Sequence, residues 1–366
     1  MSEIQKPTKK TFPLLRIVQV SAVICATVLI FCVLQQLLMP KYASAVYEGG
    51  MIREYYDSTM NHDVIFLGDC EAYTTYSPVI LWDEFGITSY IRGSPQQLIW
   101  HSYYVLEDLL RYETPKIVVL NVAAMKYGEP QSEPYNRLTI DGMRFSTSKI
   151  GAVNSSRTED EDRLSYFLPF FRYKDRWREL TAEDFRYFIN KPRVSINGFM
   201  PRTDILEAGF IPDPILPADY SFSEKAYQYL ESITELSKEN NITLILVKAP
   251  TLYPHWHEEW EEQIVTFANR HNLTYINFMT LFDDIGLDFS VDTFNAGISL
   301  NVSGAEKLTR YFSEVLKEYI EPTQIHNDEK TIRYWSELTT TYKKVINRQQ
   351  EEIGQTGKII NFLIDY

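Results

Sequence analysis

The 366-residue chain is poor in cysteine and histidine, and this scarcity excludes several kinds of site. Two of its three cysteines, Cys25 and Cys32, lie inside a long apolar run near the N-terminus, so Cys70 has no partner for a disulfide framework. The six histidines form no cluster with metal-ligand spacing, and no glycine-rich phosphate-binding loop occurs. A metal-dependent or nucleotide-dependent enzyme is therefore disfavoured, and we expect neither a metal nor a cofactor.

Positive charge is scarce as well. The chain carries 36 lysines and arginines against 49 aspartates and glutamates, a net charge of -13. Proteins that bind nucleic acid need a basic surface to neutralise phosphates. The composition therefore argues against a nucleic-acid partner.

An apolar run at residues 17–39 predicts a transmembrane helix, because a run of this length crosses about 30 Å of hydrocarbon. Several basic residues precede the run, whereas Lys41 alone follows it closely. This bias places the N-terminus inside and the main domain outside the cell. We therefore expect a single-pass protein of the cell membrane with a cytoplasmic segment at residues 1–16.

A cleavable signal peptide is the alternative interpretation of this run. The apolar stretch is longer than the usual signal-peptide core. The nearest small-residue cleavage pattern, at residues 43–45, lies beyond Pro40 and Lys41. We therefore favour an uncleaved anchor.

Alternating strand and helix patterns after the run predict an α/β fold with a parallel sheet. Short apolar runs predict strands at residues 63–68, 88–92 and 116–123. Residues 241–248 are interpreted as a buried strand and 274–278 as a further strand. Helical spacing predicts helices at residues 96–111, 223–240, 255–271 and 303–319. We expect one large domain at residues 40–322 and a C-terminal extension at 323–366, with a further helix at 331–352.

Residues 128–220 interrupt this alternation. They are rich in aromatic, charged and proline residues and show no clear period. We interpret them as an insertion that caps one face of the sheet. Trp177 and its aromatic neighbours are interpreted as packing residues rather than ligand contacts.

The turn Gly68-Asp69-Cys70 ends the first predicted strand. Open parallel sheets place their ligands at the carboxyl ends of the strands. A thiol there is exposed at the strand end, where nearby helix N-terminal amides can activate it or stabilise an oxyanion. Cys70 is therefore a candidate nucleophile.

With this turn, the chain resembles the SGNH (GDSL-like) hydrolase superfamily, in which a Gly-Asp-Ser turn after the first strand carries the nucleophile. The resemblance implies a three-layer α/β/α flavodoxin-like fold in which Cys70 replaces the serine. It also implies that Gly93 is the second-block glycine and Asn121 the third-block asparagine of the oxyanion hole.

The last block of the superfamily supplies an aspartate and a histidine just before the final helix. In the corresponding loop here, Asn295 stands at the acid position and Ser299 at the base position, with Asp292 nearby. Asn301 and Gly304 are expected to shape this loop. Ser303 is the expected N-cap of the final helix, because Glu306 follows it at capping-box spacing.

A nucleophile without its base loses about a millionfold in turnover in well-studied triads. A thiol suffers less than a hydroxyl, because a few per cent of it is ionised even unassisted. His255 and His257, after the fourth predicted strand, are the histidines that could substitute for the missing base. Their alternative role is a solvated helix start.

Other polar residues near the strand ends are expected to line a cleft, or else to cap a helix or pair locally. They are Asp69, Glu71, Arg92, Gln97, Lys126, Lys248 and Asp292.

Two functions follow from the resemblance. One is a membrane-anchored extracytoplasmic esterase or acyltransferase that acts on a surface polysaccharide or glycolipid. It is similar to the single-span proteins of lipoteichoic-acid D-alanylation (the DltD type), which act alongside a membrane-bound O-acyltransferase. The other is a non-catalytic subunit that keeps the fold and binds an acyl donor, a glycan or the partner transferase.

Overall fold

The structure is a computed structural model that describes residues 14–39, 49–58, 60–130, 132–189, 192–320 and 328–364. The chain forms two compact units. One contains residues 1–41 and 168–191, and the other contains residues 42–167 and 192–366. Most of the predicted cytoplasmic segment, residues 1–13, lies outside the described residues.

The larger unit is built on a five-stranded parallel sheet of order β2-β1-β3-β4-β5. Its strands are β1 (Val64–Gly68), β2 (Ser89–Gly93), β3 (Ile117–Asn121), β4 (Thr243–Lys248) and β5 (Thr274–Asn277). The five strands predicted from the sequence are confirmed. This order is the doubly wound, flavodoxin-like one, and its direction reverses between β1 and β3, so the carboxyl ends of these two strands flank the expected ligand crevice.

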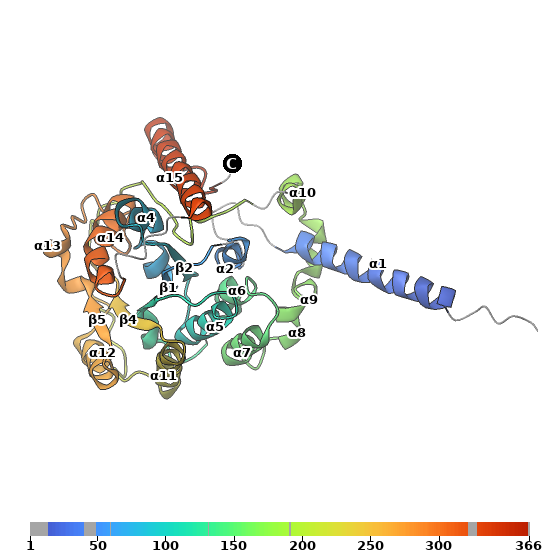
Figure 1. Ribbon diagram of the computed structural model, residues 1–366, viewed down its shortest axis with the longest axis horizontal. Helices are drawn as coiled ribbons and strands as arrows, with labels where there is room; N and C mark the ends of the chain where they lie inside the picture. The colour runs from blue at the N-terminus through green and yellow to red at the C-terminus, as the bar shows by residue number, and fades with distance from the viewer. Residues whose placement is uncertain are drawn as a thin grey trace, which may run out of the picture. The chain divides into compact units, whose positions relative to one another are not determined.

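Helices cover both faces of the sheet, as predicted (Figure 1). On one face, Leu67, Leu120 and Leu246 belong to a buried core with α5 (Ile99–Leu109), α11 (Glu224–Glu239) and α12 (Glu258–His271). On the other, Phe66 stacks on Tyr76 at 4.3 Å between ring centroids and faces Phe312 of α14 at 6.4 Å. The helices on this face are α4 (Pro78–Phe85) and α14 (Val302–Lys317).

The C-terminal extension packs on this second helix layer. It consists mainly of α15 (Glu329–Thr356), which lies beside α4. Trp335 stacks on Trp82 of α4 at 5.4 Å, and Tyr342 donates a hydrogen bond to Glu306 of α14. The extension is therefore part of the larger unit.

The N-terminus of α14 differs from the prediction. Asn301, not Ser303, is the N-cap, and its side chain accepts a hydrogen bond from the Gly304 amide at 3.2 Å. Glu306 is bonded to Tyr342 and Arg310, so its carboxylate serves packing rather than a capping box. Gly304 is required by close approach, because a Cβ there would lie 2.6 Å from the Asp292 carbonyl oxygen.

The predicted insertion at residues 128–220 contains short helices that are assigned to both units. The larger unit holds α6 (Glu133–Ile140), α7 (Thr147–Ser156) and α8 (Arg163–Phe167). The smaller unit holds α9 (Phe170–Tyr173), η3 (Lys174–Arg178) and α10 (Ala182–Ile189).

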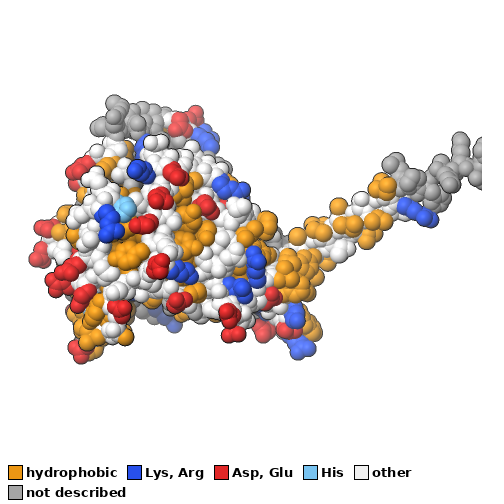
Figure 2. All heavy atoms as spheres, turned by 90° about the horizontal axis from the view of Figure 1, so that it is seen from below, with side chains coloured by type: hydrophobic (Ala, Val, Ile, Leu, Met, Phe, Trp, Pro, Cys, Tyr) orange, Lys and Arg blue, Asp and Glu red, His pale blue; other side chains and the backbone are white. Residues whose placement is uncertain are grey.

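The smaller unit is built around α1 (Leu14–Leu38), in which residues 16–38 are long and apolar enough to cross a membrane and an 18-residue stretch has a mean hydropathy of 2.7. Such a helix fits a single membrane span or a signal sequence. Hydrophobic side chains cover the visible face of α1 (Figure 2). The helices α9 and α10 contact α1. Trp177 is 60% exposed, so its prediction as a packing residue is wrong.

Candidate functional site

The turn after β1 is tightly packed against the ends of β2 and β3. Gly68 has a φ of 153°, and a Cβ there would lie 2.9 Å from the Asn121 Cβ. A Cβ at Gly93 would lie 2.9 Å from the Gly68 carbonyl oxygen. The three positions implied by the resemblance, at residues 70, 93 and 121, are therefore brought to one edge of the sheet by β1, β2 and β3.

Cys70 begins α3 (Cys70–Tyr73), directly after the turn, and remains partly exposed. Asp69 is the N-cap of this short helix, and its carboxylate accepts a hydrogen bond from the Glu71 amide at 3.0 Å. The thiol thus lies between two acidic residues at the strand end.

A buried ion pair next to the thiol connects α3 to β4. The Lys248 Nζ lies 2.8 Å from Glu71 Oε2 and also donates to the Ala249 carbonyl at 2.8 Å. The Asn121 amide donates to the same Glu71 oxygen at 3.1 Å. The amide of Asn121 is therefore committed to Glu71 in this structure. We call Asp69, Cys70, Glu71, Lys126 and Lys248 the strand-end cluster.

The electrostatics of the strand-end cluster disfavour a thiolate. Burial, with the negative charges of Asp69 and Glu71, raises the pKa of the Cys70 thiol well above its usual value. Burial and the charge of Glu71 raise the pKa of Asp69 to about 6. Burial acts against the charge of Glu71 too, but Lys248 and its hydrogen bond outweigh it and lower the pKa of Glu71. Glu71 thus stays ionised, and Cys70 stays a thiol at neutral pH.

Alkylation of Cys70 by iodoacetamide is expected to accelerate about tenfold for each pH unit from pH 7 to 9, without a plateau, because only the thiolate reacts. The rate can be measured by intact mass on the Cys25→Ser/Cys32→Ser chain, which leaves one thiol. Asp69→Asn removes a charge that raises the thiol pKa, so it should react faster at pH 7. A plateau below pH 8 would mean that the folded protein stabilises the thiolate.

The loop before α14 holds Asn295 and Ser299 against each other. The Asn295 side chain accepts from the Ser299 amide at 2.7 Å and donates to the Ser299 hydroxyl at 3.2 Å. Asp292 is fully buried and pairs with Lys307 at 2.6 Å. Within the described ranges, no hydrogen bond or ion pair joins these three residues to Cys70. The pair with Lys307 ties the loop to α14.

An extended segment at residues 201–217, which sequence reasoning missed, is attached to this loop. The Leu206 amide donates to the Thr293 carbonyl at 3.1 Å, and the Ala296 amide donates to the Leu206 carbonyl at 2.8 Å. Exposed apolar side chains of the segment, which we call the apolar strip, are Ile205, Leu206, Phe210, Ile211, Ile215 and Leu216. Paired apolar residues between prolines and acids were the available signal, but they fit neither a helical nor a strand period.

His255 connects the apolar strip to the region after β4. Its ring nitrogen Nδ1 accepts from the Ile215 amide at 3.4 Å, and the His257 ring lies 3.0 Å from the Ile215 carbonyl oxygen. Burial and the positive charge of Lys126 lower the pKa of His255. Neither histidine has a hydrogen bond to Cys70 in the part of the chain that the structure describes. Both precede α12 rather than lying in it, with His257 as its N-cap.

Arg92 lies outside the strand-end cluster, which corrects the prediction that it lines a polar cleft. Strand alternation places it with Tyr90 on one face of β2, beneath α2 (Gly50–Glu54) and η1 (Tyr55–Asp57). The guanidinium carbon lies 4.0 Å from the Tyr55 ring centroid and 5.1 Å from that of Tyr56. Its three nitrogens have no hydrogen-bond partner among the described residues, so cation–π contacts stabilise the buried charge.

Gln97 has a structural role at the same strand end. It is buried, and its amide donates to the Arg92 carbonyl and to the Ser102 hydroxyl, each at 3.1 Å. It therefore fixes the connection between β2 and α5.

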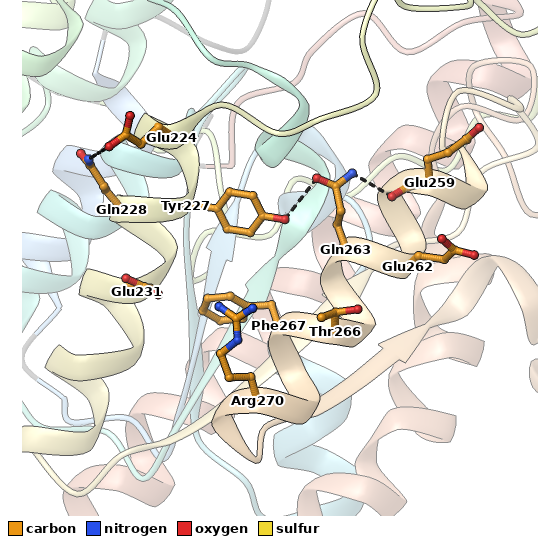
Figure 3. Close-up of a pocket in the computed structure, with 10 residues that line it drawn as sticks. All are labelled: Glu224, Tyr227, Gln228, Glu231, Glu259, Glu262, Gln263, Thr266, Phe267 and Arg270. Atoms are coloured by element: carbon orange, nitrogen blue, oxygen red, sulfur yellow. Dashed lines mark hydrogen bonds between the residues drawn. The ribbon is translucent and has the colours of Figure 1, made fainter.

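A separate groove of about 640 Å³ lies between α11 and α12 (Figure 3). Tyr227 donates to Gln263 across it, and glutamates such as Glu231 and Glu262 line it. The groove shares no residue with the strand-end cluster. Among the residues that the structure describes, no group of three or more histidine, cysteine or acidic side chains is arranged to hold a metal ion.

Comparisons with known proteins leave the family of the chain open. No family model matches the sequence, and no curated protein matches it. One similar solved structure is the "Structure of a putative lipolytic protein of G-D-S-L family from Desulfitobacterium hafniense DCB-2". The identity is 14% and the TM-score 0.35, over 70% of this chain and 99% of that one. Similarity of this extent does not assign a family.

Proposed function

We propose that the chain is a membrane-anchored extracytoplasmic subunit with an SGNH-like domain that binds an acylated glycan or glycolipid without turning it over at neutral pH. The observation that carries this proposal is the surroundings of Cys70. Burial and two acidic neighbours raise the thiol pKa, and no imidazole is hydrogen-bonded to the thiol among the described residues. A thiol kept protonated in this way is a weak nucleophile.

The proposed ligand class rests on the chemistry of the strand-end cluster and of the apolar strip. The cluster offers acidic and basic groups with no large excess of either sign, which suits a polyhydroxylated, uncharged headgroup. The apolar strip is hydrogen-bonded to the loop before α14 and to His255. A ligand that contacts both is amphiphilic, with its glycan at the strand ends and its acyl chain along the strip.

The proposed location and partner rest on the anchor. If α1 crosses the cell membrane with its N-terminus inside, the larger unit faces the cell surface, where glycolipids and surface polysaccharides occur. A membrane-bound O-acyltransferase is the proposed partner, because this domain would present the acyl acceptor or donor to it.

The ligand can be tested by titration calorimetry on the full chain in lipid nanodiscs. We expect a soluble dihexanoyl diglucosyl glycerol to bind at least about tenfold more tightly than the free disaccharide, because the acyl chains bury apolar area. Lys126→Met should weaken binding, since Lys126 is a partly exposed cation of the cluster. Lys238→Met, an exposed site on α11, is the matched control. Equal binding by the two variants, or no binding by the wild-type chain, would contradict the proposal.

A slow thiol acyltransferase or esterase is the second candidate. It is favoured by the partial exposure of Cys70 and by its position beside Gly93 at the strand ends. The two functions differ in the intact mass after incubation with an activated acyl ester at pH 7. An adduct that forms, decays and is absent in Cys70→Ala would establish turnover, whereas an unchanged mass supports the binding subunit.

A further inference from the structure

Residues 170–189, which are far from α1 in the sequence, pack against the C-terminal part of α1. The elements α9, η3 and α10, at residues 170–189, contact α1 and belong to the same compact unit. The Phe170 ring lies 5.2 Å from the Phe31 ring of α1. Phe31 precedes the last residue of α1, Leu38, by about two turns, which is roughly 10 Å along the helix axis. The contact between Phe170 and Phe31 therefore lies within the apolar part of α1, about two turns before its C-terminal end.

Arg176 connects residues 170–189 to the C-terminal end of α1 by hydrogen bonds. Its Nη1 donates to the carbonyl oxygens of Leu38 and Met39, each at 3.0 Å. The last carbonyls of a helix have no partner inside the helix, and in a water-poor surrounding they need one. The other guanidinium nitrogen, Nη2, donates to Asp184 of α10 at 2.9 Å. One arginine thus satisfies the end of α1 and holds η3 against α10.

The surface of this segment combines exposed aromatic rings with charged side chains of both signs. Phe171, Trp177 and Phe185 are 44%, 60% and 54% exposed. Residues 170–189 also carry charges of both signs: basic Arg172, Lys174, Arg176, Arg178 and Arg186, and acidic Asp175, Glu179, Glu183 and Asp184. Aromatic rings at the ends of a membrane helix lie at the headgroup level, where charged side chains remain in contact with water. Figure 2 shows hydrophobic side chains gathered beside one end of α1, with basic and acidic side chains next to them.

We propose that residues 170–189 form a membrane-interface collar that lies in one leaflet around the C-terminal end of α1. The collar continues the apolar surface of α1, so the bilayer is its occupant. It follows that α1 stays in the mature protein, because removal of α1 would leave Phe170 and Arg176 without the groups that they contact. The proposal rests on the anchoring part of the proposed function and is independent of any ligand at the strand-end cluster.

Tryptophan quenching tests the position of the collar. The full chain is placed in nanodiscs that contain anionic lipid with brominated acyl chains, and its six tryptophans are excited. We expect bromine to quench a share of the emission that Trp177→Phe removes. The other tryptophans serve as the internal control, because Trp100, Trp260 and Trp335 are buried in the larger unit. The same quenching in wild type and Trp177→Phe would overturn the proposal.

A second pair of variants separates the collar from a general loss of folding. Arg176→Ala should speed hydrogen exchange across residues 170–189, because it releases the end of α1, whereas Arg178→Ala, an exposed cation on η3, should change it little. Both variants should bind the glycolipid probe like the wild type, so failure of the collar and failure of the strand-end site are distinguishable. A chain extracted from membranes with α1 removed, as shown by intact mass, would also overturn the proposal.

Discussion

Lys248→Met is expected to destabilise the larger unit by about 3–5 kcal/mol, because it leaves the buried Glu71 carboxylate without its cation. The side chain of Lys248 is 3% exposed and that of Glu71 is 16% exposed, so water replaces the lost ammonium group poorly. Urea unfolding of the full chain in detergent micelles, followed by tryptophan fluorescence, measures the change.

Two further variants show whether the charge itself is the cause. Glu71→Leu/Lys248→Met removes both charges and should recover much of the lost stability, since a buried pair is often replaceable by apolar side chains. Arg333→Met breaks an exposed pair with Glu329 on α15, whose side chains are 67% and 88% exposed. Its effect should stay below about 1 kcal/mol. If Lys248→Met lowers the free energy of unfolding as little as Arg333→Met does, the strand-end cluster is open to water.

The sheet could be predicted from the sequence because most of its strands are short apolar runs and the sheet is covered on both faces. The parallel direction of the strands then follows from the crossover connections. The helices of residues 128–189 could not be predicted in the same way. They span only four to ten residues each, which is shorter than the window in which a 3.6-residue period becomes visible.

The strand-end residues could be placed because a β-strand delivers its last residues to a known edge of the sheet. Their partners could not, since the Glu71–Lys248 pair joins residues 177 positions apart. Arg92 shows the limit of reasoning from position alone. It comes one residue before Gly93, yet strand alternation turns its side chain into the tyrosine-lined core below α2 and η1.

The largest change in reactivity is expected from Asn295→Asp/Ser299→His, which restores the acid–base pair that the resemblance implies. Asn295 and Ser299 are already hydrogen-bonded, so a carboxylate and an imidazole at these positions can pair in the same register. A positioned base contributes about 10²- to 10⁴-fold. Acylation of Cys70 by an activated ester at pH 7 should therefore rise by that factor, provided that residue 299 faces the thiol.

The controls for this variant have to separate chemistry from folding. Ser299 is 4% exposed, so the larger histidine fits only if the loop shifts. The urea midpoint of unfolding shows whether the domain tolerates the substitution. Asn295→Asp/Ser299→Asn carries the same acid without an imidazole and should stay at the wild-type rate. Adding Cys70→Ala to the histidine variant should abolish the adduct. A folded histidine variant with an unchanged rate would show that the loop before α14 is not directed at Cys70. In that case the likeness to the hydrolases would end at the turn after β1, and the apolar strip and the strand-end cluster alone would define the site.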